Sequence, residues 1–192
     1  VFGKSFSDAM SIVAKKDYIL FTDDERLRSY CLSEFGVNGV WTQLVLSELV
    51  QKGILTQEEY VDAVIKLVSF NFVHTSINKA VIYRTGEKYD WDLGKPIFLK
   101  VISLLGEGYS HKISSGLVAM DFITSIWIDE EVPQDKKEAV ISAVLRVMVD
   151  KRDKIEVLAI LRTVLVKMPL VDARVKEEIK DFLNKFSSNE SL

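Results

Sequence analysis

The sequence has few of the residues that mark disulfide-rich, zinc-binding or membrane-spanning proteins. It contains one cysteine, Cys31, so no disulfide can form within the chain, and we expect a reducing compartment, the cytoplasm. The two histidines, His74 and His111, lie far apart without a cysteine beside them, which disfavours a zinc site. No apolar run approaches the roughly 18 residues of a membrane-spanning helix, and no signal peptide is recognised. A membrane partner is therefore not expected.

An excess of positive charge is also missing. The 192-residue chain has a formal net charge of −3, which argues against a strongly basic, nonspecific nucleic-acid binder but allows a local contact. The short basic cluster at residues 151–154 lies at a predicted helix junction, where cations are usually solvated. No glycine-rich phosphate loop and no Ser/His/Asp order is present. With 48% hydrophobic and 28% charged residues, the composition is globular rather than disordered.

What the chain does contain is an acidic turn directly after a short apolar segment. Residues 18–21 are apolar, β-prone and too few for a helix, so they predict a buried parallel strand. This strand leads into Thr22, Asp23 and Asp24, while Asp8 lies near the start of the preceding predicted helix. Ligands of open α/β sheets bind at the carboxyl ends of strands. We therefore expect the three aspartates to share one rim of the sheet.

The periodicity of apolar residues divides the chain into two parts. Residues 1–84 predict an incomplete α/β domain with one or two short parallel strands, at 18–21 and 37–41, among helices at 5–16, 22–36, 42–52, 56–70 and 76–83. Residues 85–96 contain two glycines and a proline and break every period, which predicts a linker. Residues 97–186 predict an all-α bundle with its central helix at 112–127. The polar residues 187–192 are expected to form a disordered tail. The predicted fold class is thus predominantly α.

The order of these pieces resembles the C-terminal half of a PIN domain, a metal-dependent ribonuclease fold. The family pattern is an acidic residue opening a helix, a hydrophobic strand, Thr-x-Asp, and a helix ending near Gly-Val. The matching positions here are Asp8, residues 18–21, Thr22-Asp23-Asp24 and Gly36-Val37. The segment from Val40 to Leu55 is also similar to the end of that fold. The resemblance covers about residues 5–83 and does not extend to the helical part.

The resemblance implies a function and a set of site residues. Asp8 and Asp24 would be two of four catalytic, metal-binding carboxylates, Asp23 would assist, Thr22 would orient the turn, and Thr42 would support it. The expected cofactor is Mg²⁺ or Mn²⁺, because hard cations prefer carboxylate oxygens, and the expected substrate is RNA. Two further acids and the first strands of a PIN domain have no counterpart in this sequence. We therefore expect the fragment alone to be inactive.

A plainer interpretation of the same acids stays open. Polar and acidic residues beside helix starts commonly cap free backbone N–H groups, and carboxylates there gain from the helix dipole. This applies to Asp8 and equally to Thr22, Asp23 and Glu25. On that interpretation the protein is a non-enzymatic helical interaction module. An apolar patch left by the missing half sheet would then be covered by that missing half, by a protein partner or by a second copy of the chain. Cys31 and the three tryptophans are expected to pack in cores.

Overall fold

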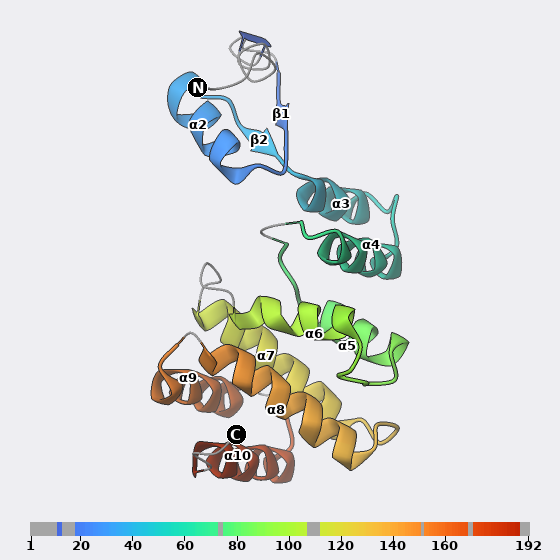
Figure 1. Ribbon diagram of the computed structural model, residues 1–192, viewed down its shortest axis with the longest axis vertical. Coiled ribbons are helices and arrows are strands. Elements are labelled where there is room, and N and C mark those ends of the chain that lie inside the picture. Colours follow the sequence, from blue (N-terminus) through green and yellow to red (C-terminus); the bar gives the residue numbers. More distant parts are fainter. Residues whose placement is uncertain are drawn as a thin grey trace. The chain divides into compact units, whose positions relative to one another are not determined.

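The computed structural model describes residues 11–12, 18–72, 75–106, 112–150, 152–168 and 171–188. Helices dominate these residues, so the predicted fold class is confirmed (Figure 1). The chain divides into two compact units, with the boundary inside helix α4. The first unit is Val1–Ala63 with Asn71–His74, and the second is Val64–Phe70 with Thr75–Leu192. The elements of the described residues are β1 (Leu20–Phe21), α2 (Glu25–Phe35), β2 (Gly39–Val40), α3 (Thr42–Gln51), α4 (Gln57–Ser69), α5 (Lys79–Lys88), α6 (Pro96–Ser103), a 3-10 turn η1 (Leu104–Gly106), α7 (Lys112–Ile128), α8 (Gln134–Asp150), α9 (Lys154–Lys167) and α10 (Ala173–Ser188).

The first unit is built on a parallel strand pair joined by a helix. Leu20 of β1 is paired with Gly39 of β2, and α2 forms the crossover between the two strands. Gly36 ends α2 in the left-handed conformation, with φ 65°, and its N–H donates to the last carbonyls of the helix. Leu20, Cys31 and Val37 form a small buried core with Leu27 beside it. The predicted helix end at Gly36, the second strand and the core position of Cys31 are confirmed.

The predicted burial of the first strand is wrong. The strand is only two residues long, and of the predicted segment 18–21 only Leu20 is buried. Ile19 is 69% exposed and Phe21 is 60% exposed. The reason is that β1 is paired with β2 alone among the described residues. Leu20 packs in the core with Cys31 of α2, whereas Ile19 and Phe21 are not covered by it.

The start of α4 follows from a reciprocal cap that its sequence contains. Thr56 Oγ1 accepts a hydrogen bond from Glu59 N–H at 3.1 Å, and the Glu59 carboxylate accepts from Thr56 N–H at 2.8 Å. These two bonds satisfy backbone donors that a helix start leaves unpaired. The predicted helix start at residue 56 is therefore confirmed.

The second unit is a helical bundle with α7 at its centre, as the sequence predicts. α7 packs against α5, α8, α9 and α10. Its fully buried side chains include Met120, Phe122 and Ile123. Close approach of α7 and α9 depends on Gly116, because a Cβ there would lie 2.7 Å from Ile160 Cγ2.

The predicted linker at 85–96 is not a linker. Residues 85–88 are the last turn of α5, and Trp91 is only 8% exposed. The Trp91 ring packs edge-on against Tyr83 and Phe98, and the backbone N–H of Trp91 donates to Gly86 O at 2.8 Å. Left-handed φ angles at Asp90 and Trp91 turn the chain back onto α5. The apparent break in period is thus a tight turn inside the second unit. The first two residues of the predicted tail, 187 and 188, are helical, since α10 continues to Ser188, and residues 189–192 lie outside the described residues.

Candidate functional site

Asp23, the first carboxylate of the predicted site, is bound to the start of α3. Its Oδ1 accepts a hydrogen bond from Thr42 N–H at 2.9 Å, and its Oδ2 accepts from Thr42 Oγ1 at 2.8 Å. Thr42 is the first residue of α3, so Asp23 satisfies one of the unpaired donors of that helix. The N–H of Thr42 is thus capped by a carboxylate at the end of β1, 19 positions earlier in the chain.

Asp24 caps the other helix that begins at this turn. It is the N-cap residue of α2, and its Oδ1 accepts from Leu27 N–H at 3.1 Å. Thr22 Oγ1 accepts from Asp24 N–H at 3.2 Å, so Thr22 shapes the turn. With Asp24 as its cap, α2 starts at Glu25. Asp24 is exposed, and its Oδ2 makes no hydrogen bond to a described residue.

The structure thus brings Asp23, Asp24, Thr22 and Thr42 together at the carboxyl end of β1. Asp8 lies outside the described residues. Within the described parts of the chain, no group of three or more His, Cys, Asp or Glu side chains is arranged to hold a metal ion. The donor type nevertheless fits a hard divalent cation, because carboxylate oxygens have more than one lone pair each and Asp24 Oδ2 is open to solvent.

Arg28 is a neighbour of the acidic turn that the sequence analysis missed. Its Nη1 donates to Thr22 O at 2.8 Å, and its guanidinium lies 4.8 Å from the centre of the Trp41 ring. Gly39 is required beside it, since a Cβ at that position would lie 2.6 Å from Arg28 Cγ. The sequence did contain a signal for this neighbour, because Arg28 follows Asp24 by four residues and therefore lies on the same face of α2.

The second unit contains a partly buried polar cluster at the turn between α7 and α8. The Tyr83 hydroxyl donates to the Asp129 carboxylate, and Lys137 Nζ donates to Trp127 O at 2.9 Å. Burial and the bond to Asp129 raise the pKa of Tyr83, and the same bond lowers the pKa of Asp129. Lys137 is only 7% exposed, yet it satisfies a carbonyl at the end of α7. The cluster ties α5, α7 and α8 together.

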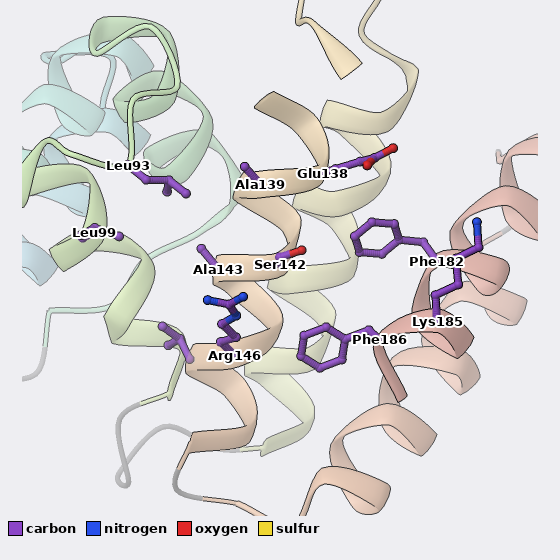
Figure 2. A pocket seen from close by; sticks show the side chains of 11 residues that line it. Leu93, Leu99, Glu138, Ala139, Ser142, Ala143, Arg146, Phe182, Lys185 and Phe186 are labelled. Carbon is purple, nitrogen blue, oxygen red and sulfur yellow. The ribbon is translucent and has the colours of Figure 1, made fainter. Parts of the chain in front are cut away.

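A groove lies along α8 in the same unit (Figure 2). Its volume is about 730 Å³, and it lies between α10 on one side and α6 with the turn before it on the other. Small side chains of α8 form its floor, and larger apolar ones form its walls. The lining residues are Leu93, Leu99, Glu138, Ala139, Ser142, Ala143, Arg146, Val147, Phe182, Lys185 and Phe186.

Comparison with known proteins gives no relative for this chain: no family model, no curated protein and no solved structure matches it. Among the described residues, no helix is both long and apolar enough to cross a membrane.

Proposed function

We propose that the first unit is the C-terminal part of a PIN-like, divalent-metal-dependent endoribonuclease, with Asp8, Asp24 and Asp23 among its metal ligands. The observation that carries the proposal is the parallel β1–α2–β2 arrangement with two adjacent aspartates at the carboxyl end of β1. That is the edge at which α/β sheets bind their ligands. The order of Asp8, strand, Thr22-Asp23-Asp24 and Gly36 supports the same assignment.

The residues of the turn have separate tasks in this proposal. Asp24 supplies an oxygen that is exposed to solvent, while its other oxygen fixes the carboxylate to the start of α2. Thr42 holds both oxygens of Asp23 and so fixes the orientation of that carboxylate. A bound Mg²⁺ or Mn²⁺ would lower the pKa of a water ligand and neutralise charge on the phosphate. Carboxylates held in place before the cation arrives need less reorganisation to bind it.

The decisive experiment changes the charge of Asp24 without removing its cap. Asparagine caps helices about as well as aspartate, so Asp24→Asn should leave the fold intact. We expect Asp24→Asn to lower Mn²⁺ affinity at least tenfold, measured by electron paramagnetic resonance, and to abolish cleavage of single-stranded RNA by the full-length protein.

Asp153→Asn is the matched control. Asp153 caps α9 in the same manner, its Oδ1 accepting from Glu156 N–H at 2.7 Å, but it lies in the second unit. This variant should leave Mn²⁺ binding and cleavage unchanged. Equal cleavage by the wild type and Asp24→Asn, or none with either Mg²⁺ or Mn²⁺, contradicts the nuclease proposal.

A second candidate is a non-enzymatic interaction module, in which the aspartates only cap helices. The observation that favours it is the apolar surface of the first unit. Tyr18, Ile19 and Phe21 are exposed around β1, and Leu32 and Phe35 are exposed on α2. An exposed apolar surface of this kind is typical of a protein–protein interface. Size-exclusion chromatography with light scattering tests this candidate, since a strict monomer that binds no hydrophobic dye contradicts it.

A further inference from the structure

Arg28 lies across the carboxyl ends of both strands of the first unit. Its aliphatic stem passes over Gly39 of β2, where a Cβ would lie 2.6 Å from Arg28 Cγ and 2.9 Å from its Cδ. Its Nη1 donates to Thr22 O at 2.8 Å, and its guanidinium lies 4.8 Å from the centre of the Trp41 ring. Thr22 directly follows β1, and Trp41 directly follows β2. The cation is therefore placed at the edge of the sheet that carries the acidic turn.

Thr22 connects this cation to the aspartate that is most open to solvent. The carbonyl of Thr22 accepts from Arg28, and its hydroxyl accepts from Asp24 N–H at 3.2 Å. Asp24 is the N-cap of α2, and Arg28 lies one turn later, its backbone N–H donating to Asp24 O at 3.1 Å. An exposed carboxylate and a guanidinium are thus fixed to the same short turn.

The acids of this turn do not neutralise Arg28. Its half-buried side chain makes one hydrogen bond and one ring contact with described residues, and it forms no ion pair with a described carboxylate. A guanidinium stays protonated and has several N–H donors but no acceptor, so it cannot be a metal ligand. Its planar array of donors matches the oxygens of a phosphate. The free donors are therefore complementary to an anion that comes from outside the chain.

We infer that Arg28 binds a phosphate oxygen of the RNA substrate beside the acidic turn. The inference rests on the proposed nuclease function, because it gives that same site its contact to the substrate. Carboxylates repel a phosphate, and Arg28 supplies a positive charge from the chain itself to offset this repulsion. The contact with Trp41 holds the guanidinium in place, which lowers the entropy lost when a phosphate binds.

A purely structural role for Arg28 makes a different prediction. In that role the residue would only fasten the acidic turn to β2 through Thr22 O. A phosphate contact releases a counterion from the nucleic acid, so it changes how binding depends on salt. Fastening a turn releases none. The salt dependence of RNA binding therefore separates the two roles.

The experiment measures RNA binding by variants of Arg28 in the full-length protein. The probe is a fluorescein-labelled single-stranded RNA of about 12 nucleotides, followed by fluorescence anisotropy with Ca²⁺ in place of Mg²⁺ and checked on a gel for intactness. Arg28→Gln should lower the affinity about tenfold and make the slope of log affinity against log salt shallower by about 0.7. Arg28→Lys keeps the charge and should therefore keep the wild-type slope.

Arg26→Gln is the matched control. It removes the same charge from the same helix, but Arg26 is exposed and lies two positions before Arg28, so the two side chains do not face each other. This variant should keep the wild-type slope and an affinity within about twofold of the wild type. Circular dichroism checks that each variant retains its helices.

Three results overturn the inference. These are no RNA binding by the wild type, an unchanged salt slope in Arg28→Gln, and an equal loss of slope in Arg26→Gln. Cleavage tests the nuclease proposal separately. If Asp24→Asn cleaves as well as the wild type while Arg28→Gln has the shallower slope, the nuclease proposal fails and the phosphate contact stands. Cleavage that depends on Asp24, together with an unchanged slope in Arg28→Gln, has the opposite meaning.

Discussion

The two units of this chain differ in how much of their apolar surface they bury. The core of the first strand–helix–strand element contains Leu20, Cys31 and Val37, while Phe21 and Ile19 beside them are exposed. In the second unit, α7 alone buries Met120, Phe122, Ile123 and Ile126 completely. Stability in the second unit therefore comes from a contiguous core, whereas the first unit depends more on caps and turns. The difference indicates that the described residues of the first unit leave apolar surface exposed, around Ile19 and Phe21, that a further element would have to cover.

The largest expected effect breaks the core of the second unit. Phe122→Ala should lower the free energy of unfolding by about 3–5 kcal/mol, because Phe122 is fully buried and packs near Trp91. Leu20→Ala in the first unit should cost less, about 1–2 kcal/mol, since its surroundings can relax into solvent. Urea denaturation followed by tryptophan fluorescence measures both values. Leu117→Ala, at an exposed position of α7, is the control and should be nearly neutral.

A smaller loss of stability is expected at Gly86, where the Trp91 ring lies against the backbone of α5. A Cβ added at Gly86 would lie 2.2 Å from Trp91 Cζ3, so Gly86→Ala should cost about 1–3 kcal/mol and shift the Trp91 signal in near-ultraviolet circular dichroism. Gly36→Ala in the first unit meets no atom within 4 Å and should cost only about 1 kcal/mol through its left-handed φ. An unchanged Trp91 signal in Gly86→Ala would refute the packing explanation.

The caps of the two units should respond alike to truncation. Asp24→Ala and Asp153→Ala each remove a carboxylate that accepts an N–H bond at a helix start, so each should lower stability by about 1 kcal/mol. Thermal unfolding measures the effect. If Asp24→Ala instead stabilised the chain, the carboxylate would be under electrostatic strain beside Asp23, and the capping interpretation of this residue would be wrong.

The smallest effect concerns pH. The pKa of Tyr83 is raised in the folded chain above its ordinary value of 10.0, so the protonated hydroxyl stabilises the fold below about pH 10 and this contribution is lost as pH rises further. The pKa of Asp129 is lowered, so its contribution is present above about pH 4 and is lost toward more acidic pH. Tyr83→Phe should flatten the urea midpoint at both ends of the pH range. A Tyr83→Phe profile parallel to the wild type would contradict this coupling.

The helices were predictable because their signals are local. Capping residues at Thr56, Gly36 as a helix end and the apolar face of 112–127 each depend on neighbours within one or two turns. The error at 85–96 arose because a left-handed turn at Asp90 and Trp91 depends on the space that Gly86 leaves, which periodicity does not report. The burial of β1 was also overestimated, because a hydrophobic strand is buried only where other elements cover it.

At the candidate site, the sequence predicted that the acidic residues lie together after the first strand, but it did not predict the hydrogen-bond partner of each residue. The acidic turn follows β1 as expected, yet the bond from Thr42 to Asp23 spans 19 positions and has no local signature. The groove on α8 was not foreseen, because its residues come from three separate segments. Only the small residues 139, 142 and 143 at helical spacing offered a signal.

The link between Asp23 and Thr42 has a consequence for detecting ligands. Whatever withdraws Asp23 from Thr42 leaves the first N–H group of α3 without its acceptor. Exchange of that amide with solvent deuterium would then accelerate, although α3 itself contacts no ligand. The amide of Thr42 therefore reports, by nuclear magnetic resonance, any event that moves the Asp23 carboxylate away from the start of α3.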